Sequence, residues 1–141
     1  MSDRSSPLEQ QVRSGRPVVS FTVGDSMEPL LYDRSTRVVI CRADRPLKPG
    51  ELPLYRRPNG RFIMHRIIRA DAGHYYTRGD NRCGLETVPR DWMLGVVTEI
   101  YRGKHHFSVD HPVYRAYVLL WNAIYPLRWI GYKCRGMRRK R

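Results

Sequence analysis

A serine that could act as a nucleophile lies in residues 23–29, which read Val-Gly-Asp-Ser-Met-Glu-Pro. Ser26 follows a short apolar run and a glycine, so we expect it at the mouth of a turn, exposed and rigidly held. A serine hydroxyl is a poor nucleophile at neutral pH, so it needs a base within hydrogen-bond distance and N–H donors aimed at the developing oxyanion. The alternative interpretation is a turn or helix-cap residue.

The elements that would position Ser26 are predicted to be strands, because short apolar runs rich in β-branched and aromatic residues alternate with turn residues. These runs lie at residues 18–23, 37–41, 52–55, 62–68, 75–77 and 94–101. Asn59-Gly60 is the clearest hairpin turn between two of them. A helical turn is expected within 27–32, with Pro29 suited to its beginning.

The chain of 141 residues is long enough for one domain with one sizeable core. Residues 1–17 are rich in Ser, Gly, Pro and charge without a helical or strand period, which predicts a flexible leader that contributes no chemistry. Residues 18–102 are expected to form the mainly β domain.

Residues 103–141 are expected to form a basic aromatic helix and tail. The large apolar side chains of the predicted helix are Val113, Tyr114, Tyr117, Val118, Leu119, Leu120, Trp121, Ile124, Tyr125, Leu127, Trp129 and Ile130. Arg115 and Asn122, seven residues apart, share one face, so we expect an amphipathic helix with a narrow polar stripe. The 12 uncharged residues between Arg115 and Arg128 are too few to span a bilayer, and Pro126 is expected to kink or end the helix.

The positive charge is concentrated in the same C-terminal region. The chain has 26 Lys and Arg against 13 Asp and Glu, a net charge of +13, and residues 103–141 hold nine basic residues and one acidic residue. An aromatic helix with a basic end is typical of a chain that lies on an anionic membrane surface. The alternative is a helix that packs on the core and is followed by a solvated tail.

Cys41, Cys83 and Cys134 are odd in number and lack C-x-x-C spacing, so neither a disulfide framework nor a zinc site is predicted. No cofactor or metal is expected, and His105 and His106 are interpreted as surface residues. The first twenty residues contain no apolar run of signal-peptide length. We therefore expect the protein in the cytoplasm or peripherally on the cytoplasmic face of a membrane.

Five short segments occur in one order along the chain. They are Ser26-Met27-Glu28-Pro29, Leu47-Lys48-Pro49-Gly50-Glu51-Leu52, His65-Arg66-Ile67-Ile68, Gly79-Asp80-Asn81 and Leu94-Gly95-Val96-Val97. Together they resemble the superfamily of type I signal peptidases and LexA-like self-cleaving repressors, over about residues 20–102. The resemblance implies an all-β peptidase fold, Ser26 as the acylating nucleophile, and a substrate laid as an extended strand along a groove.

The resemblance also implies the general base. Bacterial signal peptidases and the repressors use a lysine, whereas the endoplasmic-reticulum and archaeal signal peptidases have a histidine followed by an arginine. His65-Arg66 matches the second branch, and no lysine lies between Lys48 and Lys104. A histidine with an ordinary pKa near 6.5 suits a base at neutral pH. The alternative is a half-buried structural histidine.

Asp80 and Glu86 are the candidates for a carboxylate that orients His65. In the histidine branch the corresponding motif resembles Gly-Asp-Asn-Asn, followed by an aspartate six residues after the first Asp. This chain instead has Arg82 at the position of the second Asn and Glu86 at the position of the later aspartate. We favour Glu86 as the orienting residue, with Asp80 alternatively holding the turn through backbone N–H groups. Gly24 replaces a hydroxyl residue found in several signal peptidases, which removes a side-chain donor from the oxyanion hole.

These observations predict a serine endopeptidase of signal-peptidase type that cleaves a leader or precursor peptide. One alternative is a LexA-like regulatory or nucleic-acid-binding protein, although seventeen polar residues before the predicted domain are too few for a helix-turn-helix. Specific nucleic-acid binding is therefore not expected, while the basic tail could bind phosphates without specificity. The other alternative is an inactive scaffold that binds peptides in the same groove.

Overall fold

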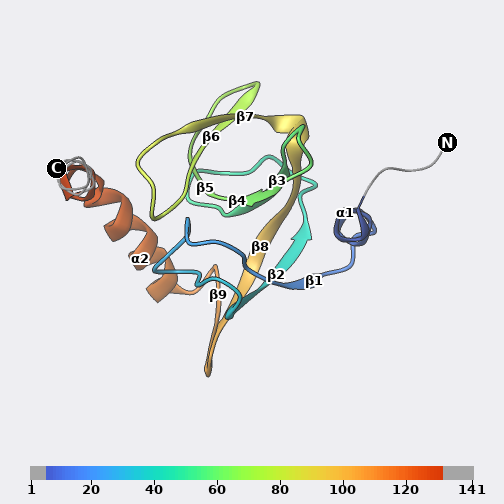
Figure 1. Ribbon diagram of the computed structural model, residues 1–141, viewed down its shortest axis with the longest axis horizontal. Helices are drawn as coiled ribbons and strands as arrows, with labels where there is room; N and C mark the ends of the chain where they lie inside the picture. The colour runs from blue at the N-terminus through green and yellow to red at the C-terminus, as the bar shows by residue number, and fades with distance from the viewer. Residues whose placement is uncertain (1–5, 132–141) are drawn as a thin grey trace.

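The computed structural model describes residues 6–131, which form a mainly β domain with a helix at each end (Figure 1). The larger sheet is antiparallel and curled, with the strand order β1-β2-β8-β3-β4, and β9 also pairs with β8. Its strands are β1 (Val18–Phe21), β2 (Thr36–Arg42), β3 (Pro53–Arg56), β4 (Phe62–Met64), β8 (Met93–Arg102) and β9 (His105–Ser108). The predicted mainly β class with a C-terminal helix is confirmed.

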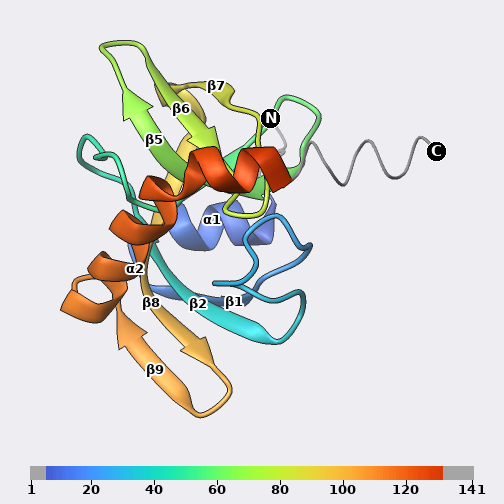
Figure 2. The same ribbon diagram turned by 90° about the vertical axis from the view of Figure 1, so that its left-hand side faces the viewer.

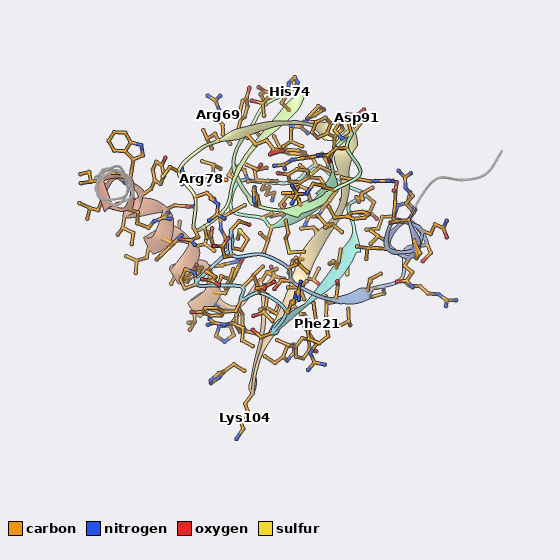
Figure 3. All side chains as sticks on the ribbon, in the orientation of Figure 1. Phe21, Arg69, His74, Arg78, Asp91 and Lys104 are labelled. Carbon is orange, nitrogen blue, oxygen red and sulfur yellow. The ribbon has the colours of Figure 1, made fainter. Side chains whose placement is uncertain are left out.

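The second sheet contains β5 (Arg66–Ala70), β6 (His74–Arg78) and β7 (Glu86–Pro89), all antiparallel. A short 3-10 helix at Arg90–Trp92 connects it to β8. Figure 1 shows this sheet at one end of β8 and the β8–β9 hairpin at the other end. Figure 3 shows Lys104 projecting from the tip of that hairpin.

All six apolar runs identified in the sequence contain strands, but the run at 62–68 is divided between the two sheets. β4 ends at Met64 and β5 begins at Arg66, so His65 lies where the chain passes from one sheet to the other. The sequence did not predict β7 and β9. β7 reads Glu-Thr-Val-Pro and β9 begins with two histidines, so neither carries an apolar run.

The hydrophobic core packs on the adjacent strands β2, β8 and β3, and it includes Val38, Ile40, Leu54 and Val97. β8 approaches β2 very closely at Gly95. A Cβ atom added at Gly95 would lie 2.6 Å from Ile40 Cγ2 and 2.9 Å from the Cys41 carbonyl oxygen. Only glycine therefore fits at position 95 without moving β2 and β8 apart.

The prediction of a flexible leader over 1–17 is wrong for Pro7–Arg13, which form helix α1. Ser6 caps this helix by accepting a hydrogen bond from the Glu9 N–H at 3.2 Å, and Pro7 stands in the first turn, where proline is favoured. Val12 is fully buried against Gly95. Contact with the core thus stabilises a helix that is too short to form alone.

Helix α2 (Pro112–Ala123) covers the opposite side of the strands from α1 (Figures 1 and 2). The His111 side chain caps it by accepting a hydrogen bond from the Val113 N–H at 3.1 Å. The chain is helical again over 125–131, so the interruption predicted near Pro126 is present just before it. The predicted basic tail, with Lys133, Cys134, Arg135 and residues 138–141, lies outside the described residues.

Among residues 6–131, no helix combines the length and the apolar character needed to cross a membrane.

Candidate active site

The side chains of Ser26 and His65 meet, although they are 39 residues apart in the sequence. Ser26 Oγ lies 3.1 Å from His65 Nε2, within hydrogen-bond distance. Ser26 stands in the turn after β1, and His65 stands at the junction of β4 and β5. This contact has the geometry that a serine nucleophile and its general base require.

The turn that carries Ser26 contains one helical-type hydrogen bond, from the Leu31 N–H to the Met27 carbonyl oxygen at 2.9 Å. The predicted helical turn is thus present, but it does not begin at Pro29, which follows a cis peptide bond. Gly24 has a φ of +93°, in the left-handed region that favours glycine, and its N–H donates to Asp33 Oδ1 at 2.8 Å. The backbone conformation therefore accounts for glycine at position 24.

The loop at residues 79–81 packs directly on the serine turn. The Asn81 N–H donates to the Ser26 carbonyl oxygen at 2.8 Å, and the Asp80 N–H contacts Met27 Sδ at 3.3 Å. A Cβ atom added at Gly79 would lie only 2.5 Å from the Ser26 carbonyl oxygen. Glycine at position 79 is therefore what allows the loop to approach and hold the backbone of Ser26.

Asp80 and Arg66 form a buried, bidentate ion pair. Arg66 Nε and Nη2 donate to the two carboxylate oxygens of Asp80, both at 2.8 Å, and the two side chains are 0% and 3% exposed. Burial opposes the charge of Arg66, but the hydrogen bonds and charge of Asp80 outweigh it and raise the pKa of this guanidinium. Asp80 thus holds Arg66 rather than backbone N–H groups of its own turn, which corrects that part of the prediction.

The Arg66–Asp80 pair joins the two halves of the site. Arg66 follows His65 directly in the chain, and Asp80 belongs to the loop that packs on Ser26. Arg66 Nη1 also donates to the Gly50 carbonyl oxygen at 2.9 Å and to the Tyr114 hydroxyl at 3.0 Å. The pair therefore fixes the distance between the β4–β5 junction that carries His65 and the turn that carries Ser26.

Glu86 does not contact His65 by a hydrogen bond. Its carboxylate instead accepts from Arg57, whose Nε lies 3.1 Å from Oε1 and whose Nη2 binds Oε2. Within residues 6–131, His65 makes no hydrogen bond other than the one with Ser26. The favoured assignment of Glu86 as a hydrogen-bonding orienter of His65 is thus not what the structure has, because Arg57 occupies that carboxylate.

The pKa of His65 is lowered, mainly because the ring is largely buried and burial disfavours the charged imidazolium. The negative charges of Glu86 and Asp80 oppose this shift, while the positive charges of Arg57 and Arg82 add to it. His65 is consequently neutral at pH 7, the form that can accept a proton from Ser26.

Two further features surround the serine. Asp25 is exposed, as expected, and it pairs with Arg82 at 2.5 Å, a hydrogen bond that lowers the pKa of Asp25. The positive charge of Arg82 therefore lies beside the site. Within the described chain, the Ser26 N–H makes no hydrogen bond.

A largely apolar groove of about 290 Å³ leads to the Ser26–His65 pair. One wall is the segment 20–24 at the end of β1, and the other is β4 with His65. β1 and β4 are the two ends of the strand order in the curled sheet. The remaining lining residues are Leu8, Met27, Leu31, Ile40 and Leu54.

The C-terminal helices hold the loop that follows Gly79, which sequence reasoning missed. Trp121 Nε1 and Arg128 Nη1 donate to the Asp80 carbonyl oxygen at 2.9 Å and 2.5 Å, and the Tyr117 hydroxyl donates to the Asp80 carboxylate at 3.1 Å. The Tyr125 hydroxyl donates to the Cys83 carbonyl oxygen at 2.6 Å. The spacing of Tyr117, Trp121 and Tyr125, four residues apart, is a signal that could have indicated a shared helical face.

No group of three metal-ligating side chains is found within residues 6–131. His105 and His106 are exposed on β9, as predicted, and His106 stacks on Tyr101 with ring centroids 4.2 Å apart.

Comparisons with protein-family models and with curated protein sequences find no match for this chain.

Proposed function

We propose that the protein is a serine endopeptidase of signal-peptidase type, which cleaves a leader or precursor peptide through an acyl-enzyme on Ser26. The observation that carries this proposal is the 3.1 Å contact between Ser26 Oγ and His65 Nε2 at the end of a groove. The order of the five sequence segments supports the same family, with the all-β peptidase fold that it implies.

In the proposed reaction, Ser26 Oγ attacks the carbonyl carbon of the scissile peptide bond while its proton passes to His65 Nε2. The tetrahedral intermediate then collapses, the C–N bond breaks, and His65 returns the proton to the leaving amine. Water repeats both steps to release the acyl group and restore Ser26. The Ser26 N–H is the proposed donor to the oxyanion.

The substrate is proposed to bind as an extended strand between β1 and β4. Each of these strands pairs with a single neighbour, so each has backbone N–H and C=O groups on its open side. The apolar lining of the groove suits uncharged side chains. The family resemblance implies small residues at the −1 and −3 positions of the substrate.

Asp80 and Glu86 are proposed to support His65 in different ways. Asp80 is a positioning residue, because it acts through Arg66, the chain neighbour of His65. Glu86 acts through its charge, which favours the imidazolium that forms when Ser26 loses its proton.

We propose that cleavage takes place in the cytoplasm or on the cytoplasmic face of a membrane. The described cysteines Cys41 and Cys83 are free thiols, which suits a reducing compartment.

An inactive peptide-binding scaffold is the second candidate. It is favoured by one observation, that no residue within 6–131 accepts a hydrogen bond from the Nδ1 atom of His65. In the scaffold, the groove would bind a peptide and Ser26 would not be acylated.

The test compares the N-termini of all proteins in a wild-type strain and in a Ser26→Ala strain. We expect at least one precursor to accumulate intact in the variant and to be cleaved in the wild type. Purified wild-type protein must then cleave a synthetic peptide that spans the same bond. If no N-terminus differs, the scaffold replaces the peptidase as the conclusion.

A further inference from the structure

In the helical segment at residues 112–131, the side chains that face the strands are packed against the domain or hydrogen-bonded to it. Tyr114 and Val118 are buried in the core, and Tyr117 and Trp121 are hydrogen-bonded to Asp80. Arg78, labelled in Figure 3, packs its guanidinium over the Tyr125 ring, 3.5 Å from the centroid. The inward face therefore has its partners within the domain.

The other side of the same segment is apolar and exposed. Its large side chains, which we call the outer face, are Val113 (71% exposed), Leu119 (73%), Leu120 (65%), Leu127 (71%), Trp129 (40%) and Ile130 (53%). Figure 2 shows both helical parts running along one side of the strands. A helix on the surface of a soluble protein normally presents charged residues to water, so this face indicates a partner with an apolar interior.

In the sequence, the outer face is followed by a strongly basic segment. Residues 132–141 contain no acidic residue and six basic residues, which are Lys133, Arg135, Arg138, Arg139, Lys140 and Arg141. Arg115 is also exposed on α2. The partner must therefore combine an apolar interior with a negatively charged rim.

A second copy of the chain fits these requirements poorly. The chain carries a net charge of +13, so two copies in contact would repel each other. An anionic lipid bilayer supplies both requirements at once, because acyl chains lie just below negatively charged headgroups.

We propose that the outer face docks on an anionic lipid bilayer, with its apolar side chains among the acyl chains, and that the basic residues which follow it in the sequence supply attraction to the negatively charged headgroups. This docking does not depend on the peptidase activity, and it adds a place of action. Trp121 and Arg128 hold the loop that packs on Ser26, so docking brings the candidate active site beside the membrane surface.

The test measures sedimentation of the full chain with vesicles of phosphatidylcholine alone and of phosphatidylcholine with phosphatidylglycerol. We expect binding to the anionic vesicles and at least tenfold weaker binding to the neutral ones, since each basic residue near such a surface strengthens binding by about fivefold. Changing residues 138–141 together to glutamine should weaken anionic binding at least tenfold.

Leu119→Glu tests the apolar contribution, with Val19→Glu as its matched control. The two residues are similarly exposed, at 73% and 60%, but Val19 lies on β1 away from the outer face. We expect Leu119→Glu to weaken vesicle binding at least tenfold and Val19→Glu to leave it unchanged. Leu127→Glu, at 71% exposure, provides a second variant, and circular dichroism checks that each protein is folded.

Quenching by brominated lipid reports insertion. We expect quenching of tryptophan fluorescence in the wild type and loss of most of it in Trp129→Phe. The proposal is overturned if the wild type does not bind anionic vesicles, or if it binds neutral and anionic vesicles equally well. It is also overturned if Val19→Glu weakens binding as much as Leu119→Glu. A stable dimer in solution that Leu119→Glu dissociates, without vesicle binding, would assign the face to a second copy instead.

Discussion

Replacing Gly79 by alanine should disrupt the candidate active site through a single added methyl group. The new Cβ atom would lie 2.5 Å from the Ser26 carbonyl oxygen and 3.1 Å from Ser26 Cβ. Contacts of Cβ atoms below 3.0 Å essentially do not occur, so the loop or the serine turn must move by about 0.5 Å or more. The two nearest atoms belong to Ser26, so either movement disturbs the contact by which the loop holds the nucleophile.

The expected magnitude follows from the geometry of the 3.1 Å contact between Ser26 and His65. A misplacement of about 1 Å in a catalytic group can slow a reaction about 100-fold, so a shift of half that size should slow acylation of Ser26 at least about tenfold. Overpacking of this kind also costs about 1–3 kcal/mol of stability.

Gly84→Ala is the matched control, because Gly84 lies in the same connection and an added Cβ atom there would meet no atom within 4 Å. The assay is the rate of acylation by an active-site probe, followed by intact mass, together with urea unfolding of each variant. The reasoning is refuted if Gly79→Ala is acylated at the wild-type rate, or if Gly84→Ala is slowed as much as Gly79→Ala.

Three further predictions concern the charges around the site. Asp80→Asn leaves the buried Arg66 guanidinium without its counter-charge, so the free energy of unfolding in urea should fall by about 3–5 kcal/mol; a loss below about 1 kcal/mol would contradict the structural role of this pair. The acylation rate should rise with pH as His65 loses its proton, with a midpoint below the ordinary pKa of 6.5 because the ring is buried. Glu86→Gln removes a charge that favours the imidazolium, so that midpoint should move to lower pH, and a shift to higher pH would disprove the assigned effect of Glu86.

Much of the β architecture could be predicted from the sequence, because strands in the core carry continuous apolar runs. β7 and β9 lack such runs, and their position depends on pairing with β6 and β8. Helix α1 was missed for a similar reason. Its burial depends on contacts with distant strands, because Val12 fits against Gly95 of β8 and Glu9 pairs with Arg56 of β3.

The pairing of Ser26 with His65 was also expected, because the five short segments in their order resemble a peptidase superfamily in which these two positions act together. The partners of the carboxylates were not, because Arg57 and Arg66 reach Glu86 and Asp80 from distant segments of the chain. No local spacing in the sequence indicates which arginine faces which carboxylate. The hydrogen bond from Trp121 Nε1 to the Asp80 carbonyl oxygen is likewise a tertiary contact, between residues 41 positions apart in the sequence.

The central claim is that His65 activates Ser26, and labelling by serine-directed acylating probes tests it most directly. Purified wild type, Ser26→Ala and His65→Ala are treated with a penem and with a fluorophosphonate, and their intact masses are compared. We predict one adduct per wild-type molecule and none on either variant, with all three proteins folded. An adduct that persists in Ser26→Ala, or a folded wild-type protein that no probe labels, would contradict the claim.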